Sequence, residues 1–516
     1  MTINKKARFL PYMATLMTLN PKQFIRHRSG MALILAASAM LAGCVSHSGI
    51  ESHAQLHTLP DSRSDALYGT AQANWPNSDW AGAIGGAELQ ELIAAALAGN
   101  PSLQAAAARI DAARAAIAIS RSATLPSVNA SFENTYQRYS EHGLIPPPLA
   151  GNYYSDNELA VSITYDLDFW GKHSAEMRTA LSQAQVAEAE QQSVRLMLSN
   201  AVARSWLQLA RQYAQREMSL QQRLVREKFD ALIAQRVHAG LDTQSDIQQG
   251  VLQVAALNKD ISAWDEAIAL SRNQLAALLG ASPERGSAIA RPKFDGAQHI
   301  GVPASLPLEL ISRRPDIVAA RWRVEANQGD IDAATTQFYP NVNLVGFAGL
   351  SSIGVDQFFK SGSLIVGVGP SIHLPLFEGG RLRAQLKTRV AAYDVAVATY
   401  NQSLTDALHE VADQVQMMAG SSAQIAQQQS ATDAAQRSLN LARQRQQAGT
   451  ANLLPVLSAE SLLLSQQKQT MDLVFRQAES QINLIKALGG GYDSQAHHAT
   501  PPHSPLSVSN NSKAAL

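Results

Sequence analysis

The chain of 516 residues contains the same long segment twice. The motifs Asn100-Pro101-Ser102-Leu103 and Pro126-Ser127-Val128-Asn129 return 214 positions later as Arg314-Pro315-Asp316-Ile317 and Pro340-Asn341-Val342-Asn343. Farther along, Gly171, Gly240 and Gly280 return 209 positions later as Gly380, Gly449 and Gly489. One loop-sized insertion, between about 130 and 170 of the first copy, explains the change of offset. A period near 210 exceeds that of any solenoid repeat, so the repeated unit is a whole supersecondary assembly.

Each copy predicts a helix, two strands, a very long helix, a turn and a shorter helix. The stretch from Lys172 to Ala239 contains no Gly or Pro, and the stretch from Arg381 to Ala448 contains only Gly420. At 1.5 Å per residue, each helix would reach roughly 100 Å. Apolar residues in the second stretch step by threes and fours, which predicts coiled-coil packing; they are Leu386, Val390, Tyr393, Val397, Tyr400, Leu404, Leu408, Val411, Val415 and Met418. An intermolecular helical rod would share this pattern.

Four segments alternate apolar and polar residues with the period of two expected of a sheet with one apolar face. The apolar positions are Val128, Ala130 and Phe132; Leu159, Val161, Ile163, Tyr165, Leu167 and Phe169; Val342 and Leu344; and Leu364, Val366, Val368 and Ile372. The segments fit the 9 to 11 residues of a transmembrane strand, and four tyrosines near the first hairpin's tip resemble an interfacial girdle (Tyr136, Tyr139, Tyr153 and Tyr154). A soluble sheet would also alternate.

Four strands cannot close a membrane barrel, because about eight are needed and open edges are not tolerated in lipid. The pattern therefore predicts an oligomer. Three copies would give 12 strands, but two or four copies also give even numbers.

The first 43 residues have the features of a secretory signal peptide. Basic residues from Arg26 to Arg28 precede an apolar run, Met31 to Ala42, which is too short to span a bilayer. The run ends in Leu41-Ala42-Gly43-Cys44, which resembles the lipobox of bacterial lipoproteins. We therefore expect cleavage before Cys44 and acylation, including palmitate, of that cysteine; an ordinary signal peptide with a chance cysteine is the alternative. Met13 or Met17 is an alternative start.

Composition argues against several classes of function. The 42 basic and 42 acidic residues give no net charge, so the basic footprint of a nucleic-acid-binding protein is absent. A single cysteine excludes a disulfide framework within the chain and any cysteine-based zinc site. Ser465-Gln466-Gln467-Lys468 matches a β-lactamase motif but lacks its partner motifs. We therefore expect no enzyme, no metal and no cofactor beyond the covalent lipid on Cys44.

Several spaced motifs resemble the outer-membrane factors of bacterial multidrug efflux systems, the TolC, OprM and NodT group. They are Leu310-Ile311-Ser312-Arg313-Arg314-Pro315-Asp316-Ile317, Phe338-Tyr339-Pro340, Leu374-Pro375-Leu376-Phe377-Glu378-Gly379-Gly380-Arg381 and Ala487-Leu488-Gly489-Gly490-Gly491-Tyr492. The resemblance covers roughly Trp75 to Tyr492. It implies an α+β, mainly α protein: a trimeric channel-tunnel with a 12-strand transmembrane β-barrel, four strands per protomer, continued by a long periplasmic α-helical barrel.

The resemblance also implies a passive exit duct for drugs or toxic small molecules. Its partners would be a periplasmic adaptor (membrane fusion protein) and an inner-membrane transporter of the RND or major-facilitator type. The alternatives are a periplasmic adaptor, a structural coiled-coil lipoprotein, or an outer-membrane duct for protein secretion.

The turns between the paired helices carry the candidate functional residues. Each turn has an Arg four residues before a Gly, where positive φ lets the chain reverse. The resemblance implies that this end contacts the adaptor, through Arg236, Gly240, Leu241, Arg445, Gly449 and Thr450. It also implies a periplasmic aperture, for which Asp246, Leu453 and Leu454 are the candidates. Asp242 and Asn452 are expected to begin the returning helices. Ser458 stands where the family has an acid, and Pro455 is expected to interrupt the helix start, which argues against a carboxylate gate. The adjacent Leu453 and Leu454 predict a mainly hydrophobic seal instead.

The expected domain organisation follows the duplication. Residues 1–43 are the signal peptide and 44–85 a lipidated extended segment. The repeats are 86–280 and 306–492, joined by an equatorial linker at 281–305, and 493–516 form a disordered tail.

Overall fold

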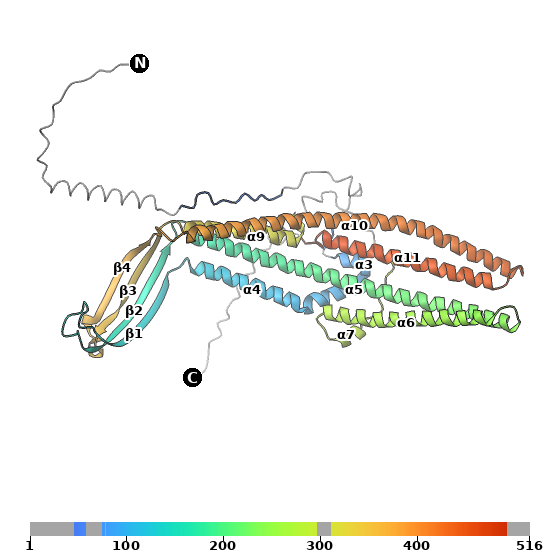
Figure 1. Cartoon of the computed structure of the whole chain (residues 1–516), viewed down its shortest axis with the longest axis horizontal. Coiled ribbons are helices and arrows are strands. Elements are labelled where there is room, and N and C mark those ends of the chain that lie inside the picture. The colour runs from blue at the N-terminus through green and yellow to red at the C-terminus, as the bar shows by residue number, and fades with distance from the viewer. Residues whose placement is uncertain (1–45, 58–74, 78, 297–310, 493–516) are drawn as a thin grey trace, which may run out of the picture. The chain divides into compact units, whose positions relative to one another are not determined.

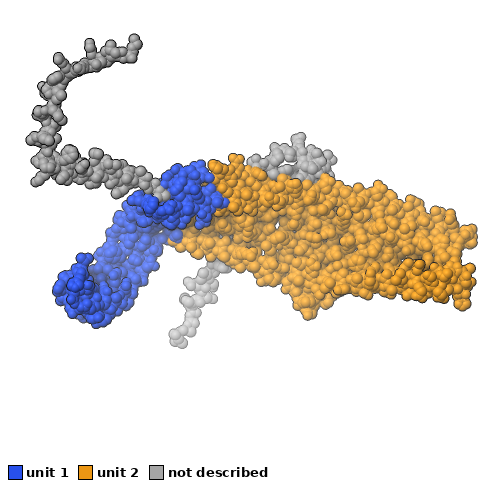
Figure 2. Space-filling model, viewed as in Figure 1, with its two compact units in different colours: residues 1–51, 123–174, 331–391 blue, residues 52–122, 175–330, 392–516 orange. Residues whose placement is uncertain are grey.

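The computed structural model describes residues 46–57, 75–77, 79–296 and 311–492. The chain divides into two compact units, which Figure 2 distinguishes by colour. Unit 1 takes in residues up to 51 together with 123–174 and 331–391. Unit 2 takes in 52–122, 175–330 and the residues from 392 onward. Cys44 and the tail expected to be disordered lie outside the described residues.

Unit 1 contains one antiparallel sheet of four strands (Figure 1). The strands are β1 (Ser127–Arg138), β2 (Tyr153–Leu167), β3 (Asn341–Ile353) and β4 (Leu364–His373). Their order is β1-β2-β3-β4, so the hairpin of the second copy lies beside the hairpin of the first. Two short 3₁₀ helices, η1 (Val355–Gln357) and η2 (Ser361–Ser363), lie between β3 and β4. The outer strands β1 and β4 each have a single neighbour in the described chain.

The register places apolar side chains on one face of all four strands. Phe132 lies opposite Leu159, Leu159 opposite Leu350, and Leu350 opposite Leu364. Because residues two apart point to the same side, Val128, Val161, Ile163, Val366 and Val368 share that face. These side chains are exposed in the isolated chain, Val366 and Val368 to 74% and 81%. The predicted single apolar face is therefore confirmed.

The end of β2 differs from the expectation. The strand ends at Leu167 rather than Phe169. The Asp168 carboxylate accepts a hydrogen bond from the Ser174 N–H (3.2 Å) in the first turn of the helix that begins at Lys172, so this side chain bonds to the helix and not to the sheet. The strand also begins at Tyr153, six residues before the clear alternation starts, where its partner is Arg138 of β1.

The helices occur in the duplicated order. The first copy has α4 (Pro101–Ser122), α5 (Lys172–His238) and α6 (Gln244–Leu278), and the second has α9 (Pro315–Thr336), α10 (Arg381–Gln447) and α11 (Leu454–Ala487). Two further helices are α3 (Trp80–Gly99), which is kinked at Gly85 and Gly86, and the short α7 (Pro283–Ser287). Both α5 and α10 have 67 residues, as predicted from the run without Gly or Pro in the first copy and the run with only Gly420 in the second.

The predicted apolar stripe of α10 consists of buried and half-buried residues. In unit 1, Leu386 and Val390 pack with Phe338. In unit 2, Val397 and Leu404 pack against Ile317 of α9.

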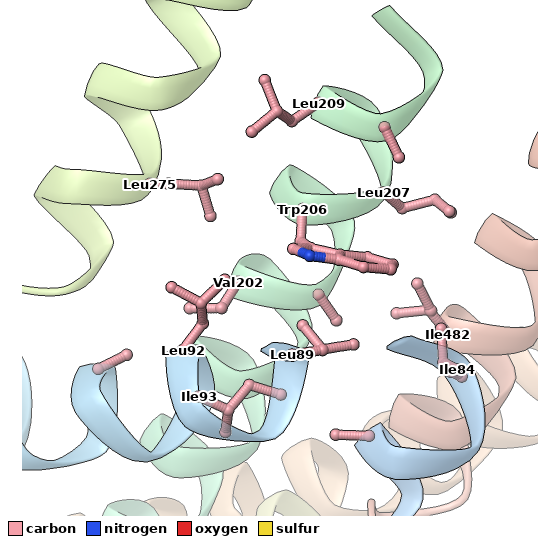
Figure 3. Packing of buried hydrophobic residues seen from close by; sticks show 14 of the residues in the cluster. Ile84, Leu89, Leu92, Ile93, Val202, Trp206, Leu207, Leu209, Leu275 and Ile482 are labelled. Carbon is pink, nitrogen blue, oxygen red and sulfur yellow. The ribbon is translucent and has the colours of Figure 1, made fainter. Parts of the chain in front are cut away.

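The main core of unit 2 surrounds Trp206 of α5, whose side chain is fully buried. Figure 3 shows Leu89 of α3, Leu275 of α6 and Ile482 of α11 around it. Helices far apart in the sequence are therefore held together by a single cluster.

Glycines at equivalent positions of the two copies follow the C-terminal ends of α6 and α11. Gly280 and Gly489 have φ values of +70° and +88°. A Cβ on Gly280 would collide with the carbonyl oxygen of Gly99, and one on Gly489 with that of Arg313. Both the backbone conformation and the close approach therefore require glycine.

In the part of the chain that the structure describes, no helix is both long enough and apolar enough to cross a bilayer. The same residues contain no group of three or more His, Cys, Asp and Glu side chains that could hold a metal ion.

Candidate functional site

The candidate residues lie at two helical turns in unit 2. One turn joins α5 to α6 and the other joins α10 to α11, and Figure 1 shows both at the same end of this unit. Near them, Val225 of α5 packs against Leu457 and Leu464 of α11. The structure therefore brings the two sets of predicted tip residues to one end of a single packed unit.

The two turns have the same pattern of backbone hydrogen bonds. In the first, the Leu241 N–H donates to the carbonyl of Arg236 (2.8 Å) and the Gly240 N–H to that of Val237 (3.0 Å). In the second, Thr450 and Gly449 donate in the same way to Arg445 (3.0 Å) and Gln446 (3.1 Å). This is the Schellman arrangement of a helix C-terminus. Gly240 and Gly449 have φ values of +73° and +70°, so the expected reversal at each glycine is confirmed.

The charged groups of the first turn are paired with one another. Arg236 donates two hydrogen bonds to the carboxylate of Asp242, from Nε (2.7 Å) and from Nη2 (2.9 Å). The hydrogen bond from Arg236 holds the pKa of Asp242 below its ordinary value, and the same bond raises the pKa of Arg236. The turn is thus closed by a bidentate ion pair.

The start of α6 corrects one expectation. Thr243, not Asp242, is the N-cap residue. Its backbone N–H (2.9 Å) and its hydroxyl (2.7 Å) both donate to one carboxylate oxygen of Asp246. Hydrogen bonds from the Thr243 side chain and backbone lower the pKa of Asp246. The sequence carries the signal, a Thr three residues before an Asp, and the prediction missed it because Asp242 was taken as the cap.

The second turn lacks the ion pair. Ala451 stands 209 positions after Asp242, and in the described chain the exposed Arg445 guanidinium has neither a carboxylate nor another acceptor. Asn452 accepts a hydrogen bond from the Leu454 N–H (3.1 Å), but Leu453 is the N-cap residue of α11, so Asn452 binds the first helical N–H from one position farther out. Pro455 does not interrupt the helix, because it lies in the first turn, where its missing N–H is not needed.

The aperture candidates have different surroundings. Leu453 is the N-cap of α11 and is 41% exposed, while Leu454 is half-buried. Below them, Val456 is buried against Ala435 and Leu439 of α10. Asp246 is half-buried and already engaged by Thr243. The part that these three residues play in an aperture stays a prediction.

Residues close to the expected lipidation site contact the first turns of α10. In unit 1, Arg383 donates to the carbonyl oxygens of Ser46 and Ser48, the latter at 3.3 Å. Ile50 is buried with Phe338, Leu382 and other residues of the same cluster. The chain that follows Cys44 is therefore fixed to the helix that follows the sheet.

Comparisons with known proteins agree with this arrangement. The family model described as outer membrane efflux protein matches residues 92–281 and 306–490. The chain is 34% identical over 360 residues to the fusaric acid resistance protein FusA of Burkholderia cepacia, covering 68% of each chain. It is 30% identical over 471 residues to the multidrug resistance outer membrane protein MdtP of Escherichia coli K12, covering 89% of this chain and 96% of MdtP.

The fold is also similar to a solved structure. The outer membrane protein VceC of Vibrio cholerae superimposes with a TM-score of 0.74 at 36% identity. The match covers 81% of this chain and all of VceC.

Proposed function

The chain belongs to the outer membrane efflux protein family and is an outer-membrane efflux channel that extends into the periplasm, not an enzyme; on this premise we propose how it assembles and what it contacts. Three copies join edge to edge, β1 of one protomer with β4 of the next, and form a 12-stranded barrel. The long helices of the three copies continue the bore through the periplasm.

The exposed edges of the sheet carry this proposal. Every residue of β1 is exposed, and Phe132 and Tyr136 are exposed to 64% and 72%. On β4, Leu364 and Ile372 are exposed to 65% and 67%. Unpaired backbone groups cost several kcal/mol each in hydrocarbon. A strand edge from a second copy satisfies them, and the shared apolar face then meets lipid.

The two turns receive the helical hairpin of a periplasmic adaptor. The first turn presents Leu241, which is 65% exposed, while its arginine, Arg236, is already paired with Asp242. The second turn offers the unpaired guanidinium of Arg445 beside Thr450. We expect Arg445 to form the charged contact with the adaptor, and Arg236 to position its own turn. An inner-membrane transporter of the RND or major-facilitator type drives export through this adaptor.

Acylation of Cys44 anchors each protomer in the inner leaflet of the outer membrane. The contacts of Ser46, Ser48 and Ile50 with unit 1 support this proposal, because they hold the following residues close to the end of the sheet. More than one acyl chain is needed for stable anchoring.

The exported compounds are drugs or toxic small molecules. The names of FusA and MdtP refer to resistance to fusaric acid and to multiple drugs. A wide passage without a fitted pocket would transport several such compounds.

The proposal is tested with the full-length protein in outer-membrane fractions. We expect an unheated trimer on denaturing gels and channels in planar bilayers. We also expect Arg445→Ala to weaken binding of the cognate adaptor about tenfold, or ~1.4 kcal/mol, with Arg437→Ala on the same helix as the control. A monomer without conductance would overturn the proposed assembly, and unchanged binding by Arg445→Ala would overturn the assignment of the second turn.

A further inference from the structure

A pocket of about 230 Å³ lies in unit 1, where the strands end and the two long helices begin. The ends of β2 and β4, the residues before α5 and α10, and the end of α9 line it. None of the tip or lipidation residues takes part. We propose that this pocket binds the headgroup of a zwitterionic phospholipid, phosphatidylethanolamine, from the periplasmic leaflet. The inference rests on the proposed placement of the sheet in the outer membrane.

A fixed aromatic pair forms one part of the pocket. The rings of Trp170 and Tyr339 stack with their centroids 4.8 Å apart and their planes 17° from parallel. The indole N–H of Trp170 donates to the carbonyl of Pro340 (2.7 Å), and the Tyr339 hydroxyl lies 3.4 Å from His47 Nε2. Amphipathic aromatic rings concentrate at the headgroup level of membranes, and their faces attract ammonium groups.

Three carboxylates lie in the same pocket: Asp166, Asp168 and Glu378. Asp166 is 3.1 Å from His173 Nε2, Asp168 accepts the Ser174 N–H, and Glu378 forms an ion pair with Arg381. These bonds hold the carboxylates in place. Because a carboxylate can accept about four hydrogen bonds, acceptor positions remain on all three for the three N–H donors of a primary ammonium.

The positive charges stand at the first residues of the two long helices. Lys172 begins α5 and Arg381 begins α10, at equivalent places in the two copies. A cation at a helix N-terminus faces the unfavourable end of the helix dipole, so helix stability does not explain either residue. Lys172 is half-buried, and in the described chain no acceptor contacts its ammonium. This ammonium is the group that we assign to the lipid phosphate.

Exposed apolar side chains next to the pocket favour a lipid over a free phosphate compound. Phe169 and Phe377, which flank the charged residues in the sequence, are exposed to 66% and 87%, and Leu376 to 50%. Acyl chains bound beside the headgroup would cover these side chains, and about 25 cal/mol is gained per Å² of apolar surface buried. Soluble phosphoethanolamine gains nothing from them.

The test is native mass spectrometry of the full-length protein in detergent, titrated with phosphatidylethanolamine or with phosphatidylglycerol of the same chains. We expect one phosphatidylethanolamine per protomer, retained at least tenfold better than phosphatidylglycerol. Asp168→Asn combined with Glu378→Gln should bring the two lipids to equal retention, and the Asn side-chain oxygen can still accept the Ser174 N–H. Lys172→Gln should weaken both lipids. Glu158→Gln, on β2 outside the pocket, is the control.

Equal retention of both lipids by the unaltered protein would overturn the inference. So would an unchanged preference in the double variant, or displacement of the lipid by phosphoethanolamine at equal concentration. The oligomer mass in the same spectra keeps the two proposals apart. A trimer without lipid preference contradicts only the headgroup site, whereas a monomer contradicts the proposed assembly.

Discussion

Arg236 and Asp242 form a bidentate ion pair across the turn between α5 and α6, with hydrogen bonds of 2.7 and 2.9 Å. The equivalent turn between α10 and α11 has the same backbone hydrogen bonds, but Ala451 replaces the aspartate. Duplication has therefore preserved the shape of the turn and changed its charge. In the first turn Arg236 is paired with Asp242, whereas in the second turn Arg445 is exposed.

Removing the carboxylate from the first turn and adding one to the second tests this difference. We expect Asp242→Ala to speed amide hydrogen exchange at Gly240 and Leu241, because the side-chain bonds that close the turn are lost. Ala451→Asp should slow exchange at Gly449 and Thr450, because Arg445 gains a partner in the same geometry. Hydrogen-exchange mass spectrometry measures both. If amide hydrogen exchange at these residues were equally fast in the variants and the parent protein, the ion pair would not stabilise the turn.

The ion-pair network around the buried Arg314 in unit 2 should make stability depend on pH. Glu410 of α10 accepts hydrogen bonds from Arg314 Nη1 and Lys486 Nζ, both at 2.8 Å. Burial raises the pKa of Glu410, but the bonds from Lys486 and Arg314 outweigh it, so the pKa lies below its ordinary value. The stabilisation is therefore present above the unfolded pKa of about 4.3 and lost as the pH falls through the lower folded value.

We expect Glu410→Gln to cost about 1.5–3 kcal/mol at neutral pH. The difference from the parent protein should shrink below about pH 4. Thermal melts across pH measure it. The control is Glu479→Gln in an exposed pair with Arg204, which should cost under ~1 kcal/mol. A difference that persists unchanged at pH 3 would contradict the assignment to the Glu410 charge.

Sequence patterns predicted the parts of the fold that depend on local composition. The run without Gly or Pro from Lys172 predicted α5 to within one residue of its end at His238. Spacing also predicted the positive φ of Gly240 and Gly449. The stacking of Trp170 on Tyr339 has no local signal, because it depends on strand pairing between residues far apart in the chain. The predicted end of β2 at Phe169 was wrong, because Asp168 continues the alternating pattern while its carboxylate binds the Ser174 N–H of α5.

Gly489 should tolerate no side chain. We expect Gly489→Ala to lower the free energy of unfolding by more than ~1 kcal/mol, because the new Cβ meets the Arg313 carbonyl and φ is positive. Gly420 in the middle of α10 has open space around it, and its change to Ala should stabilise by up to about 1 kcal/mol. Denaturant titration compares the two. Equal effects would mean that the close approach at Gly489 is unimportant.

The two faces of β4 should respond differently to charge. Val366 lies on the apolar face, and Ser371 lies on the opposite face. We expect Val366→Arg to cost about 2–4 kcal/mol in a bilayer and Ser371→Arg much less. Folding into lipid vesicles, followed on gels, measures both. If Ser371→Arg proved the more harmful change, the apolar face would not be the one that meets lipid.

The leucines at the start of α11 test the predicted seal. We expect Leu453→Ala and Leu454→Ala to raise the closed-state conductance in planar bilayers, because each removes apolar volume from the expected constriction. Leu462→Ala, an exposed leucine farther along the same helix, is the control. Closed-state conductance that stays the same in both variants would eliminate a hydrophobic seal at this position.

The most direct measurement is cryo-electron microscopy of the full-length protein in lipid nanodiscs. The proposed assembly requires β1 of each protomer to pair with β4 of its neighbour in a closed ring of three copies around one continuous passage. Single chains with unpaired β1 and β4 edges, or rings without a passage, would contradict it.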